Sequence, residues 1–356
     1  MDNATDLIGL MSGTSGDGLD IAYCRFEKKE SWTFEILHAT TVSFPENLGQ
    51  RLKQSHLLSS EDLTQLDVDF GAWMGKQVRD FCQERKLFPA AVCSHGHTVF
   101  HNPSAGYSLQ IGNGWALHRH SGFRVVNDFR MLDIQWGGQG APLVPIGDRL
   151  LFEKMDFCLN LGGIANISME HRGNRLAFDT CPFNLLLNPI AERIGAPYDD
   201  RGTWASEGTI DSSLLEKLNS LGYYQRFGAK SLGREDMERD FFPLLSESKL
   251  TDRDLLATLA EHYAQQISQV IRYYASSEKP RVLITGGGAY HDYFISRLDA
   301  CLNSQWERAA VGAELIEFKE ALIFAFLGHL RLLGIPNVLS AVTGAEKDTC
   351  SGVIYG

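Results

Sequence analysis

The stretch that most constrains the fold lies near the start of the chain, at residues 7–22. An apolar run, Leu7–Leu10, breaks into a loop of glycine, serine, threonine and aspartate, and an apolar pattern resumes at Leu19 and Ile21. This pattern is typical of a β-hairpin with a tight turn. Glycines let a backbone approach a ligand closely, and N–H groups with hydroxyls can bind a chain of phosphates. A surface hairpin with a glycine-rich tip explains the same residues, so the first turn alone does not decide between the two.

Two later stretches repeat this pattern. Residues 157–168 read as an apolar strand, a turn containing Gly162 and Gly163, and a second strand. Residues 281–289 read as a buried strand that ends in three glycines before a helical stretch. A strand, a glycine turn and a helix start together form a nucleotide-sized site. The repetition therefore favours phosphate binding at the first turn, and two similar domains that each present a glycine turn to a shared cleft.

Composition excludes several classes of protein. A chain of 356 residues is long enough for two domains, and its net charge of −11 argues against general nucleic-acid binding. It has no run of about 18 apolar residues, so no transmembrane helix is predicted. The first residues lack the basic and apolar regions of a secretory signal. Seven cysteines without a C-x-x-C pair indicate reduced thiols and a cytoplasmic protein.

Apolar spacing predicts further elements along the chain. Ser59 is predicted as the N-cap of one helix, and Thr251 with Asp254 as a capping box that opens another. The glycine-rich residues 137–142 suit a turn between domains. Lys230–Glu235 is interpreted as a solvated loop. The predicted strands are 33–37, 40–44, 90–94, 124–130, 175–179 and 352–355, and the predicted helices are 63–81, 255–274 and 317–333.

Three histidines follow the strand at 90–94, namely His95, His97 and His101. A zinc-dependent hydrolase is one hypothesis. The spacing H-x-H-x-x-x-H is loose for a metal site, and no Cys or carboxylate follows at a matching interval. A sugar-contacting turn or a structural turn is favoured.

Charged residues also end two predicted strands. Asp128 and Arg130 end the strand at 124–130, where they could line a cleft or simply form an ion pair. Asp179 ends the strand at 175–179, and Pro182 suits the first turn of a following helix. Asp179 or Thr180 could be the cap of that helix. Alternatively, Asp179 is a carboxylate that the helix dipole keeps ionised and ready to accept a proton.

Ten short stretches, in order, resemble the sugar kinase and actin-like ATPase superfamily. Within it the chain is similar to the anhydro-N-acetylmuramic acid kinase family over nearly its whole length. The matching stretches are MSGTSGDGLD at 11–20, SHGHTVFH at 94–101, QIGNG at 110–114, VVNDFRMLDI at 125–134, GGQGAPLVP at 137–145, NLGGIANIS at 160–168, FDTCPFN at 178–184, KSLGRE at 230–235, TGGGA at 285–289 and VTGA at 342–345.

The resemblance implies an α/β fold of two ribonuclease-H-like domains, with mixed β-sheets flanked by helices and a ligand cleft between them. Domain I would comprise residues 1–135 and about 322–356, and domain II residues 136–321. The implied enzyme opens 1,6-anhydro-N-acetylmuramic acid with water and phosphorylates O6 with ATP and Mg2+, in peptidoglycan recycling and amino-sugar catabolism. Its partners would be the sugar and ATP, with neither nucleic acid nor membrane, and a homodimer stays open.

The resemblance also implies roles for individual residues. Asp179 would be the base that activates water, and Asp17 and Asp20 would orient Mg2+, through water. Glu320, on a mostly apolar predicted helix, needs a partner or faces a ligand. The residues implied for ATP are Gly13, Thr14, Ser15, Gly16, Asp17, Gly18, Leu19, Asp20, Gly162, Gly163, Asn166, Gly286, Gly287 and Gly288, and those implied for the sugar are Thr98, Asp128, Arg130 and Glu320.

The sequence departs from the family pattern near the implied base. The common form is DTGPGN, whereas Cys181 and Phe183 replace both glycines here. His97 stands where Gln is usual, and Gly16 where a larger apolar residue is usual. Met11 stands where many sugar kinases of the superfamily carry an aspartate. The changed neighbours of Asp179 bear on sugar affinity. The two replaced glycines also motivate an alternative hypothesis, an ATP- or sugar-binding regulator on the same fold.

Overall fold

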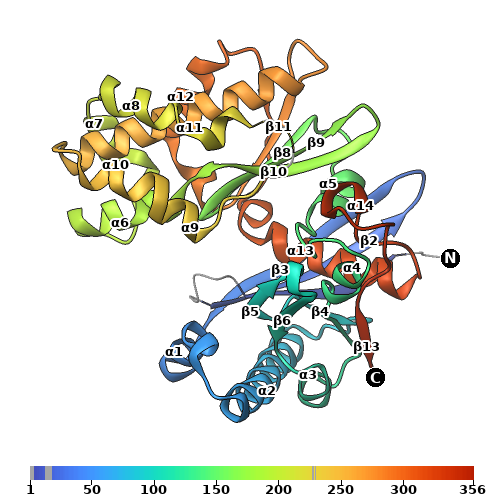
Figure 1. The fold of residues 1–356 in the computed structure, drawn as a ribbon. Coiled ribbons are helices and arrows are strands. Elements are labelled where there is room, and N and C mark those ends of the chain that lie inside the picture. Colours follow the sequence, from blue (N-terminus) through green and yellow to red (C-terminus); the bar gives the residue numbers. More distant parts are fainter. Residues whose placement is uncertain (1–3, 13–17, 227, 229) are drawn as a thin grey trace. The chain divides into compact units, whose positions relative to one another are not determined.

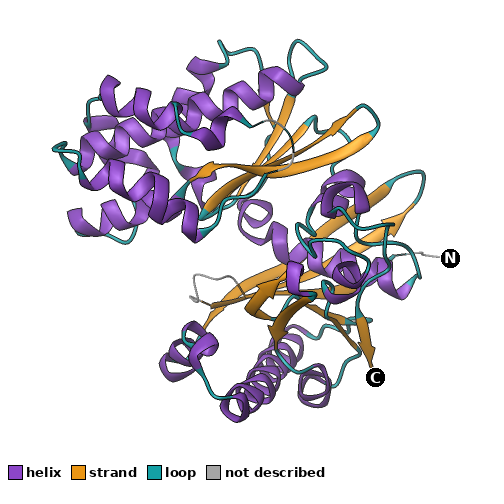
Figure 2. Cartoon of the chain, in the orientation of Figure 1, coloured by secondary structure: helices purple, strands orange, loops and turns teal. Residues whose placement is uncertain are grey.

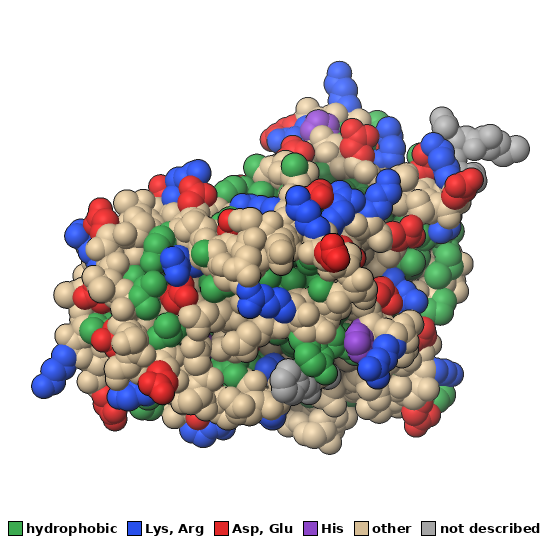
Figure 3. All heavy atoms as spheres, turned by 90° about the horizontal axis from the view of Figure 1, so that it is seen from above, with side chains coloured by type: hydrophobic (Ala, Val, Ile, Leu, Met, Phe, Trp, Pro, Cys, Tyr) green, Lys and Arg blue, Asp and Glu red, His purple; other side chains and the backbone are tan. Residues whose placement is uncertain are grey.

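The computed structural model describes residues 4–12, 18–226, 228 and 230–356, which form two compact units (Figure 1). Unit 1 runs up to Leu151 and resumes at Phe318, and unit 2 is Phe152–Glu317. Each unit contains a mixed β-sheet with helices packed against it (Figure 2). On the face shown in Figure 3, acidic and basic side chains are interspersed.

The sheet of unit 1 has six strands in the order β13-β7-β4-β1-β2-β3. The first three strands along the chain form an antiparallel meander, and β4 and β7 lie parallel to β1. The final strand, β13, pairs antiparallel with β7, which confirms the strand predicted near the C-terminus. The strands are β1 (Thr5–Ser12), β2 (Gly18–Lys28), β3 (Trp32–Ser43), β4 (Val92–Ser94), β7 (Val125–Asn127) and β13 (Val353–Tyr355), with a separate hairpin of β5 (His97–Asn102) and β6 (Tyr107–Ile111).

One strand replaces two that the sequence predicts. Residues 33–37 and 40–44 were expected as separate strands, but β3 is continuous and pairs with β2 along its whole length. Tyr23 lies opposite His38 and Cys24 opposite Ile36, so Leu37 is an extra residue in the ladder. A β-bulge therefore absorbs the interruption that the sequence pattern suggested was a break.

Helices of unit 1 follow the predicted caps. The Ser59 side chain accepts a hydrogen bond from the Asp62 N–H, which confirms the predicted N-cap of α2. A Cβ atom on Gly9 would overlap the carbonyl oxygen of Ala321, so glycine in β1 lets α13 pack directly on the sheet. The helices are α1 (Glu46–Lys53), α2 (Ser60–Arg85), α3 (Gly114–Ser121), α4 (Met131–Gln135), α5 (Pro145–Leu151), α13 (Ala313–Leu332) and α14 (Ser340–Thr343), with short 3-10 turns at Ser55–Leu57 and Pro103–Ala105.

The sheet of unit 2 repeats the strand order of unit 1. Its order is β10-β9-β8-β11-β12, with an antiparallel meander of three strands followed by two parallel ones. The equivalent part of unit 1 is β3-β2-β1-β4-β7. Two mixed sheets of one order confirm the predicted pair of similar α/β units. The strands are β8 (Phe157–Leu161), β9 (Ile164–His171), β10 (Asn174–Pro182), β11 (Arg281–Thr285) and β12 (Glu307–Arg308).

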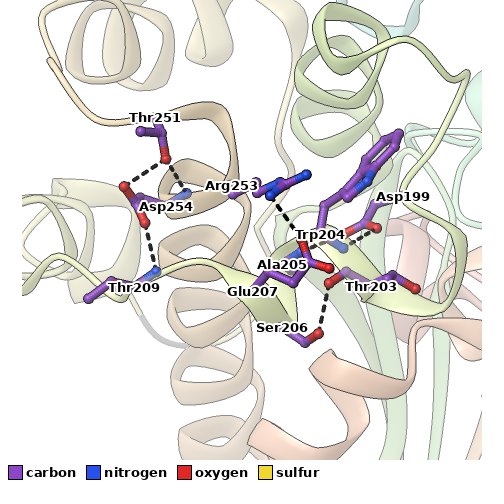
Figure 4. Close-up of polar contacts among 10 residues, drawn as sticks. All are labelled: Asp199, Thr203, Trp204, Ala205, Ser206, Glu207, Thr209, Thr251, Arg253 and Asp254. Carbon is purple, nitrogen blue, oxygen red and sulfur yellow. Dashed lines mark hydrogen bonds and ion pairs between the residues drawn. The ribbon is translucent and has the colours of Figure 1, made fainter.

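A long buried helix, α11, organises the helical part of unit 2, where it contacts α6, α7, α8 and α12. Its predicted capping box is confirmed, because Thr251 Oγ1 accepts from the Asp254 N–H (Figure 4). Asp254 also accepts from the Thr209 N–H, and Asp199 binds the first N–H groups of α7 (Figure 4). The helices are α6 (Asn184–Ile194), α7 (Thr203–Glu207), α8 (Ser212–Asn219), α9 (Arg234–Asp236), α10 (Phe242–Ser246), α11 (Asp252–Tyr274) and α12 (Asp292–Cys301), with η3 (Asp200–Gly202), η4 (Gly222–Gln225), η5 (Met237–Phe241) and η6 (Gly287–Tyr290).

The units divide after Leu151 and before Phe318, whereas the sequence placed the domain boundaries near 135/136 and 321/322. The difference arises because α5 contacts β3 and because Asp148 on α5 forms an ion pair with Lys319 on α13. Among the helices of the described residues, none is both long and apolar enough to cross a bilayer.

Candidate functional site

Asp179 lies on β10 at an irregularity of the sheet. The register of β10 against β9 shifts between Asp179 and Cys181, so Thr180 is an extra residue, and its hydroxyl donates to the Ala165 carbonyl at 2.9 Å. Asp179 is partly buried, and its Oδ2 accepts from the Leu232 N–H at 2.9 Å. Burial raises the pKa of Asp179, and the Leu232 N–H partly opposes this by favouring the charged form. The site thus contains a partly buried carboxylate that the Leu232 N–H orients.

Neither Asp179 nor Thr180 caps α6, as one reading of the sequence suggested. The cap residue is Phe183, which makes no side-chain cap hydrogen bond. The N–H groups of Phe183 and Leu185 instead donate to the carbonyl of Gly163, and that of Asn184 donates to Gly162. The carbonyl groups of the glycine turn between β8 and β9 therefore accept hydrogen bonds from the N–H groups at the start of this helix.

Two expectations about this helix are consequently wrong. Pro182 is the last residue of β10, opposite Ile164, rather than the first residue of a helical turn. The dipole of this helix was also expected to act directly on Asp179, but α6 begins only at Asn184, and its first N–H groups bind the carbonyls of Gly162 and Gly163.

A row of polar residues crosses four strands of the unit 2 sheet in register. Asp179 on β10 lies opposite Asn166 on β9, Asn166 opposite Asn160 on β8, and Asn160 beside Thr285 on β11. Thr285 donates a hydrogen bond to Asn160 Oδ1 at 3.3 Å. Cross-strand partners share a face of a sheet, so these side chains line one face together. Asn160 and Thr285 were missed in the sequence, although each is a polar residue at the end of an apolar strand.

The predicted glycine loops of unit 2 flank this row. Gly286 has φ of 81°, and a Cβ there would lie 2.8 Å from Asn160 Oδ1, so only glycine fits. Gly163 has no atom within 4 Å of such a Cβ, which leaves open space beside the turn. A cavity of about 370 Å³ opens next to Gly287 and Gly288. Its other lining residues are Asn184, Leu187, Asn188, Tyr198, Asp199, Asp200, Arg201, Tyr290 and His291.

His291 is a buried histidine among the residues that line this cavity. Its side chain is 6% exposed, and Nδ1 accepts the Phe294 N–H, which leaves the proton of the neutral ring on Nε2. Nε2 has no partner within the residues that the structure describes. Burial lowers the pKa of His291, so the neutral form is the relevant one. His291 therefore lines the cavity while its Nε2–H is buried without a hydrogen-bond partner among the described residues.

The two residues that replace family glycines are core residues. Cys181 and Phe183 are both 0% exposed, and the Phe183 ring lies 4.9 Å from Phe294 and 5.2 Å from Tyr263, measured between ring centroids. A Cβ on Gly288 would overlap the Phe183 ring. These substitutions fill the interior beneath the glycine loop, so the reason for suspecting a non-catalytic regulator is weakened.

In unit 1, Arg130 binds His95 instead of pairing with Asp128. Arg130 Nη2 lies 2.7 Å from His95 Nε2, and Nη1 donates to the Gly140 carbonyl at 2.7 Å. Because a guanidinium only donates, His95 Nε2 must accept and its Nδ1–H must donate to the Gly96 carbonyl at 3.0 Å. Burial and the Arg130 charge hold the pKa of His95 well below its usual value. Neutral His95 thus accepts a hydrogen bond from Arg130 and fixes the position of its guanidinium.

A cavity of about 510 Å³ lies beside these residues in unit 1. Asp128 lines it with a left-handed φ of 55°, and burial raises the pKa of this carboxyl. Thr98 is not among the residues that line this cavity, and its hydroxyl accepts a hydrogen bond from Gln110 Nε2 at 3.3 Å. The polar lining residues are Thr64, Asp67, His95, Tyr107, Ser108, Gln110, Asn113, Asn127, Asp128 and Tyr355.

The carboxyl group of Glu320 is affected electrostatically by Asp20 and Arg130. Burial raises the pKa of Glu320, and the charges of Lys319 and Arg130 lower it while that of Asp20 raises it. Asp20 is partly exposed on β2, and its Oδ1 accepts from Thr41 at 2.6 Å. Carboxylate oxygens are the donors that Mg2+ prefers, so this donor chemistry fits the ion.

The remaining predictions for the first loop cannot be placed. Gly13, Thr14, Ser15, Gly16 and Asp17 lie outside the described residues. Gly18 and Leu19 begin β2. Because the Leu19 side chain is 0% exposed, only its backbone is available to a ligand.

The histidine turn is not a metal centre. His97 Nδ1 lies 3.2 Å from Ser12 Oγ, and His101 Nδ1 lies 3.0 Å from Ser108 Oγ. His95 is engaged by Arg130. Over residues 4–12, 18–226, 228 and 230–356, no group of three or more His, Cys, Asp or Glu could hold a metal ion. The zinc hydrolase hypothesis is therefore wrong for this part of the chain.

The two units share one mixed strand order, and unit 2 adds glycine turns and an oriented carboxylate, so the chain is an α/β protein of two similar units. The family model "Anhydro-N-acetylmuramic acid kinase" matches residues 5–356. The chain belongs to this family and is an enzyme of the kinase class.

Curated relatives agree over the full length. Anhydro-N-acetylmuramic acid kinase of Pseudomonas syringae pv. syringae is 34% identical over 365 residues, which cover 98% of each chain. That of Vibrio cholerae is 34% identical over 364 residues, covering 98% of this chain and 97% of the relative. Among solved structures, (R)-2-hydroxyglutaryl-CoA dehydratase component A of Acidaminococcus fermentans matches with a TM-score of 0.44 at 12% identity, over 90% of this chain and 96% of that one.

Proposed function

We propose that the chain opens 1,6-anhydro-N-acetylmuramic acid with water and transfers the γ-phosphoryl group of ATP to the freed O6. Water adds its hydroxyl to the anomeric carbon, the C1–O6 bond breaks, and O6 takes the phosphoryl group. The products are N-acetylmuramic acid 6-phosphate and ADP. Family membership supports this reaction and its place in cell-wall recycling.

The observation that carries the proposal is the setting of Asp179. Leu232 N–H binds Oδ2, and the structure gives no hydrogen bond to Oδ1 from any described residue. Oδ1 is therefore the atom that takes the proton from water. Burial raises the pKa of Asp179, which makes its carboxylate a better proton acceptor.

The glycine turns of unit 2 hold ATP in this proposal. The Gly162–Gly163 turn and Asn166 contact the phosphates beside Asp179, which is opposite Asn166 in the sheet. The cavity at Gly287 and Gly288 takes the adenosine. A role in ATP binding is also proposed for residues 13–18, because the resemblance to the family implies it.

Residues of unit 1 bind the sugar. The cavity of about 510 Å³ contains Asp128, whose carboxylate suits sugar hydroxyls. Arg130, fixed by His95, supplies a cation for an anionic group of the substrate. Glu320 and Thr98 complete the proposed contacts.

Mg2+ is proposed at Asp20, with Asp17 assisting, through water. Bound there it would neutralise charge on the phosphates. We also propose a cytoplasmic enzyme, since ATP is its substrate, and treat a homodimer as the oligomeric state to be tested by light scattering.

The test is a product analysis in 18O-labelled water with ATP and the anhydro-sugar. The expected result is one labelled oxygen on the anomeric carbon of a 6-phosphorylated product, with ADP formed only when sugar is present. Asp179→Asn should lose turnover by about three orders of magnitude or more while ATP still binds. Sugar-independent ADP release, or label absent from the product, would refute the reaction.

A further inference from the structure

Three residues that follow α8 bind one residue of β10. The Tyr223 hydroxyl donates to the Asp179 carbonyl oxygen at 2.5 Å. The Asp179 N–H donates to the Lys230 carbonyl at 3.0 Å, and the Leu232 N–H donates to Asp179 Oδ2 at 2.9 Å. Both backbone groups and one carboxylate oxygen of Asp179 are thus held from the same stretch of chain.

The position of β10 explains why Asp179 needs these partners. β10 is the edge strand of its sheet, so one side of its backbone has no neighbouring strand. The bulge at Thr180 also interrupts the ladder directly after Asp179. Backbone groups at such an edge must find other partners or water. Here a tyrosine hydroxyl takes the place that the N–H of a further strand would occupy.

Tyr223 is itself held in place. Its side chain is 4% exposed, and the Lys230 ammonium lies 4.3 Å from the centroid of its ring. The same ammonium donates to the Tyr223 carbonyl at 3.2 Å and to the Arg226 carbonyl at 3.0 Å. A cation over an aromatic face and a buried phenol together limit the movement of the hydroxyl.

We propose that Tyr223 is a positioning residue for Asp179. Its hydroxyl, held by Lys230, fixes the backbone at residue 179 so that Leu232 N–H keeps Oδ2 and leaves Oδ1 for the water. Tyr223 acts only through Asp179 and does not contact the substrate. The inference rests on the proposed function, in which Asp179 is the base.

The test compares Tyr223→Phe with Tyr224→Phe. The control residue is the next one in η4, and its hydroxyl bonds His262 Nε2 at 2.9 Å instead of Asp179. Tyr223→Phe should lower kcat about tenfold to hundredfold, because a misplaced catalytic group costs rate at this scale. KM for ATP and for the sugar should stay within about twofold. Tyr224→Phe should keep kcat within about threefold of the parent.

The dependence of kcat on pH distinguishes a positioning role of Tyr223 from a general loss of packing. In the parent, the hydrogen bond from the Leu232 N–H lowers the pKa of the Asp179 carboxyl. If Asp179 is held less firmly, part of this hydrogen bond is lost and the pKa rises. The acid limb of kcat should therefore move to higher pH in Tyr223→Phe and stay in place in Tyr224→Phe. Parental kcat and pH profile in Tyr223→Phe would overturn the proposal, and so would equal losses in the two variants.

Two further variants keep the proposal testable. If Tyr223→Phe does not fold, Lys230→Met removes the ammonium over the ring but keeps the backbone carbonyl that binds Asp179. It should lower kcat several-fold with KM unchanged, and an unchanged kcat would overturn the positioning role. Asp179→Asn separates the two proposals. Substantial turnover in Asp179→Asn refutes the base itself, whereas an inactive Asp179→Asn beside a normal Tyr223→Phe refutes only Tyr223.

Discussion

The ammonium of Lys319 lies 2.7 Å from a carboxylate oxygen of Asp148, and both side chains are almost completely buried. Lys319 belongs to α13 and Asp148 to α5, so the pair joins these helices within unit 1. It also keeps a cation next to Glu320, whose pKa it lowers against the opposing effect of burial. One buried ion pair thus serves both the packing of unit 1 and the charge of a proposed sugar contact.

Breaking this pair should be costly. Lys319→Met leaves Asp148 buried without its cation, which typically costs about 3–5 kcal/mol of unfolding free energy. Urea denaturation followed by circular dichroism would measure the loss. The double variant Lys319→Met/Asp148→Leu should recover most of it, because an apolar pair needs no charge compensation. A single variant within about 0.5 kcal/mol of the parent, the range of ordinary surface changes, would contradict the prediction.

Turnover should depend on the ionisation of Asp179. The base must be a carboxylate, and burial raises the pKa of this group above its usual value of 3.8. Activity should therefore fall as the pH decreases through the raised pKa, at a higher pH than an exposed aspartate would give. A profile of kcat against pH, taken where the fold is intact, measures this limb. An activity that stays constant down to the usual aspartate range would contradict it.

The raised pKa of Asp179 also predicts how stability depends on pH: ionisation of this carboxyl, which activity requires, should lower the stability of the fold. A carboxyl whose pKa is raised in the native state binds its proton more tightly when folded than when unfolded. Its contribution to stability is present below the unfolded pKa and is lost as the pH rises through the native pKa. Asp179→Asn should therefore have a melting temperature at pH 7 equal to or above that of the parent. A clearly lower melting temperature would show that the Leu232 hydrogen bond outweighs burial.

His95 should control sugar binding through Arg130. His95→Leu removes the acceptor that lies 2.7 Å from Arg130 Nη2. A hydrogen bond to a charged group contributes about 1.5–3 kcal/mol, so KM for the sugar should rise about tenfold or more. KM for ATP should not change. His101→Leu is the matched control, because His101 bonds Ser108 and not Arg130, and a similar rise of KM in that variant would argue against a specific role.

Phe183 should be a structural residue despite its place beside Asp179. Phe183→Gly restores the residue common in the family, but it empties a site that is 0% exposed and costs about 3–5 kcal/mol. Thermal and urea unfolding would measure this loss. Phe88→Gly is the control, because Phe88 is 81% exposed and its loss should matter little. Equal unfolding midpoints for the two variants would contradict the assignment.

Local features of the fold could be predicted well. The N-caps at Ser59 and Thr251 depend on a side chain and an N–H three residues away, so a short window of sequence contains the whole interaction. Strands such as β8, β9 and β11 are apolar runs bounded by glycine turns, and their pattern is equally local. Pro182 was misread because its place at the end of β10 depends on pairing with Ile164, which lies outside any such window.

The site could be predicted only in part. Asp128 and Arg130 follow the end of β7 and Asp179 lies within β10, and resemblance to the family marked all three. Their hydrogen-bond partners could not be predicted, because Leu232 lies 53 residues from Asp179 in the sequence and His95 lies 35 residues from Arg130. A stretch read as a solvated loop, Lys230–Glu235, holds a buried Leu232 that binds the carboxylate of Asp179.

The sequence by itself determined the elements, the repeated glycine turns and the family, because these depend on residue type at short spacing. The tertiary structure alone decided which groups meet. It set Asn160, Asn166, Asp179 and Thr285 in one row, through strand register. It also brought Tyr223 and Leu232 within hydrogen-bonding distance of Asp179. Long-range pairing of backbone groups fixes such contacts, and no local pattern of residues encodes it.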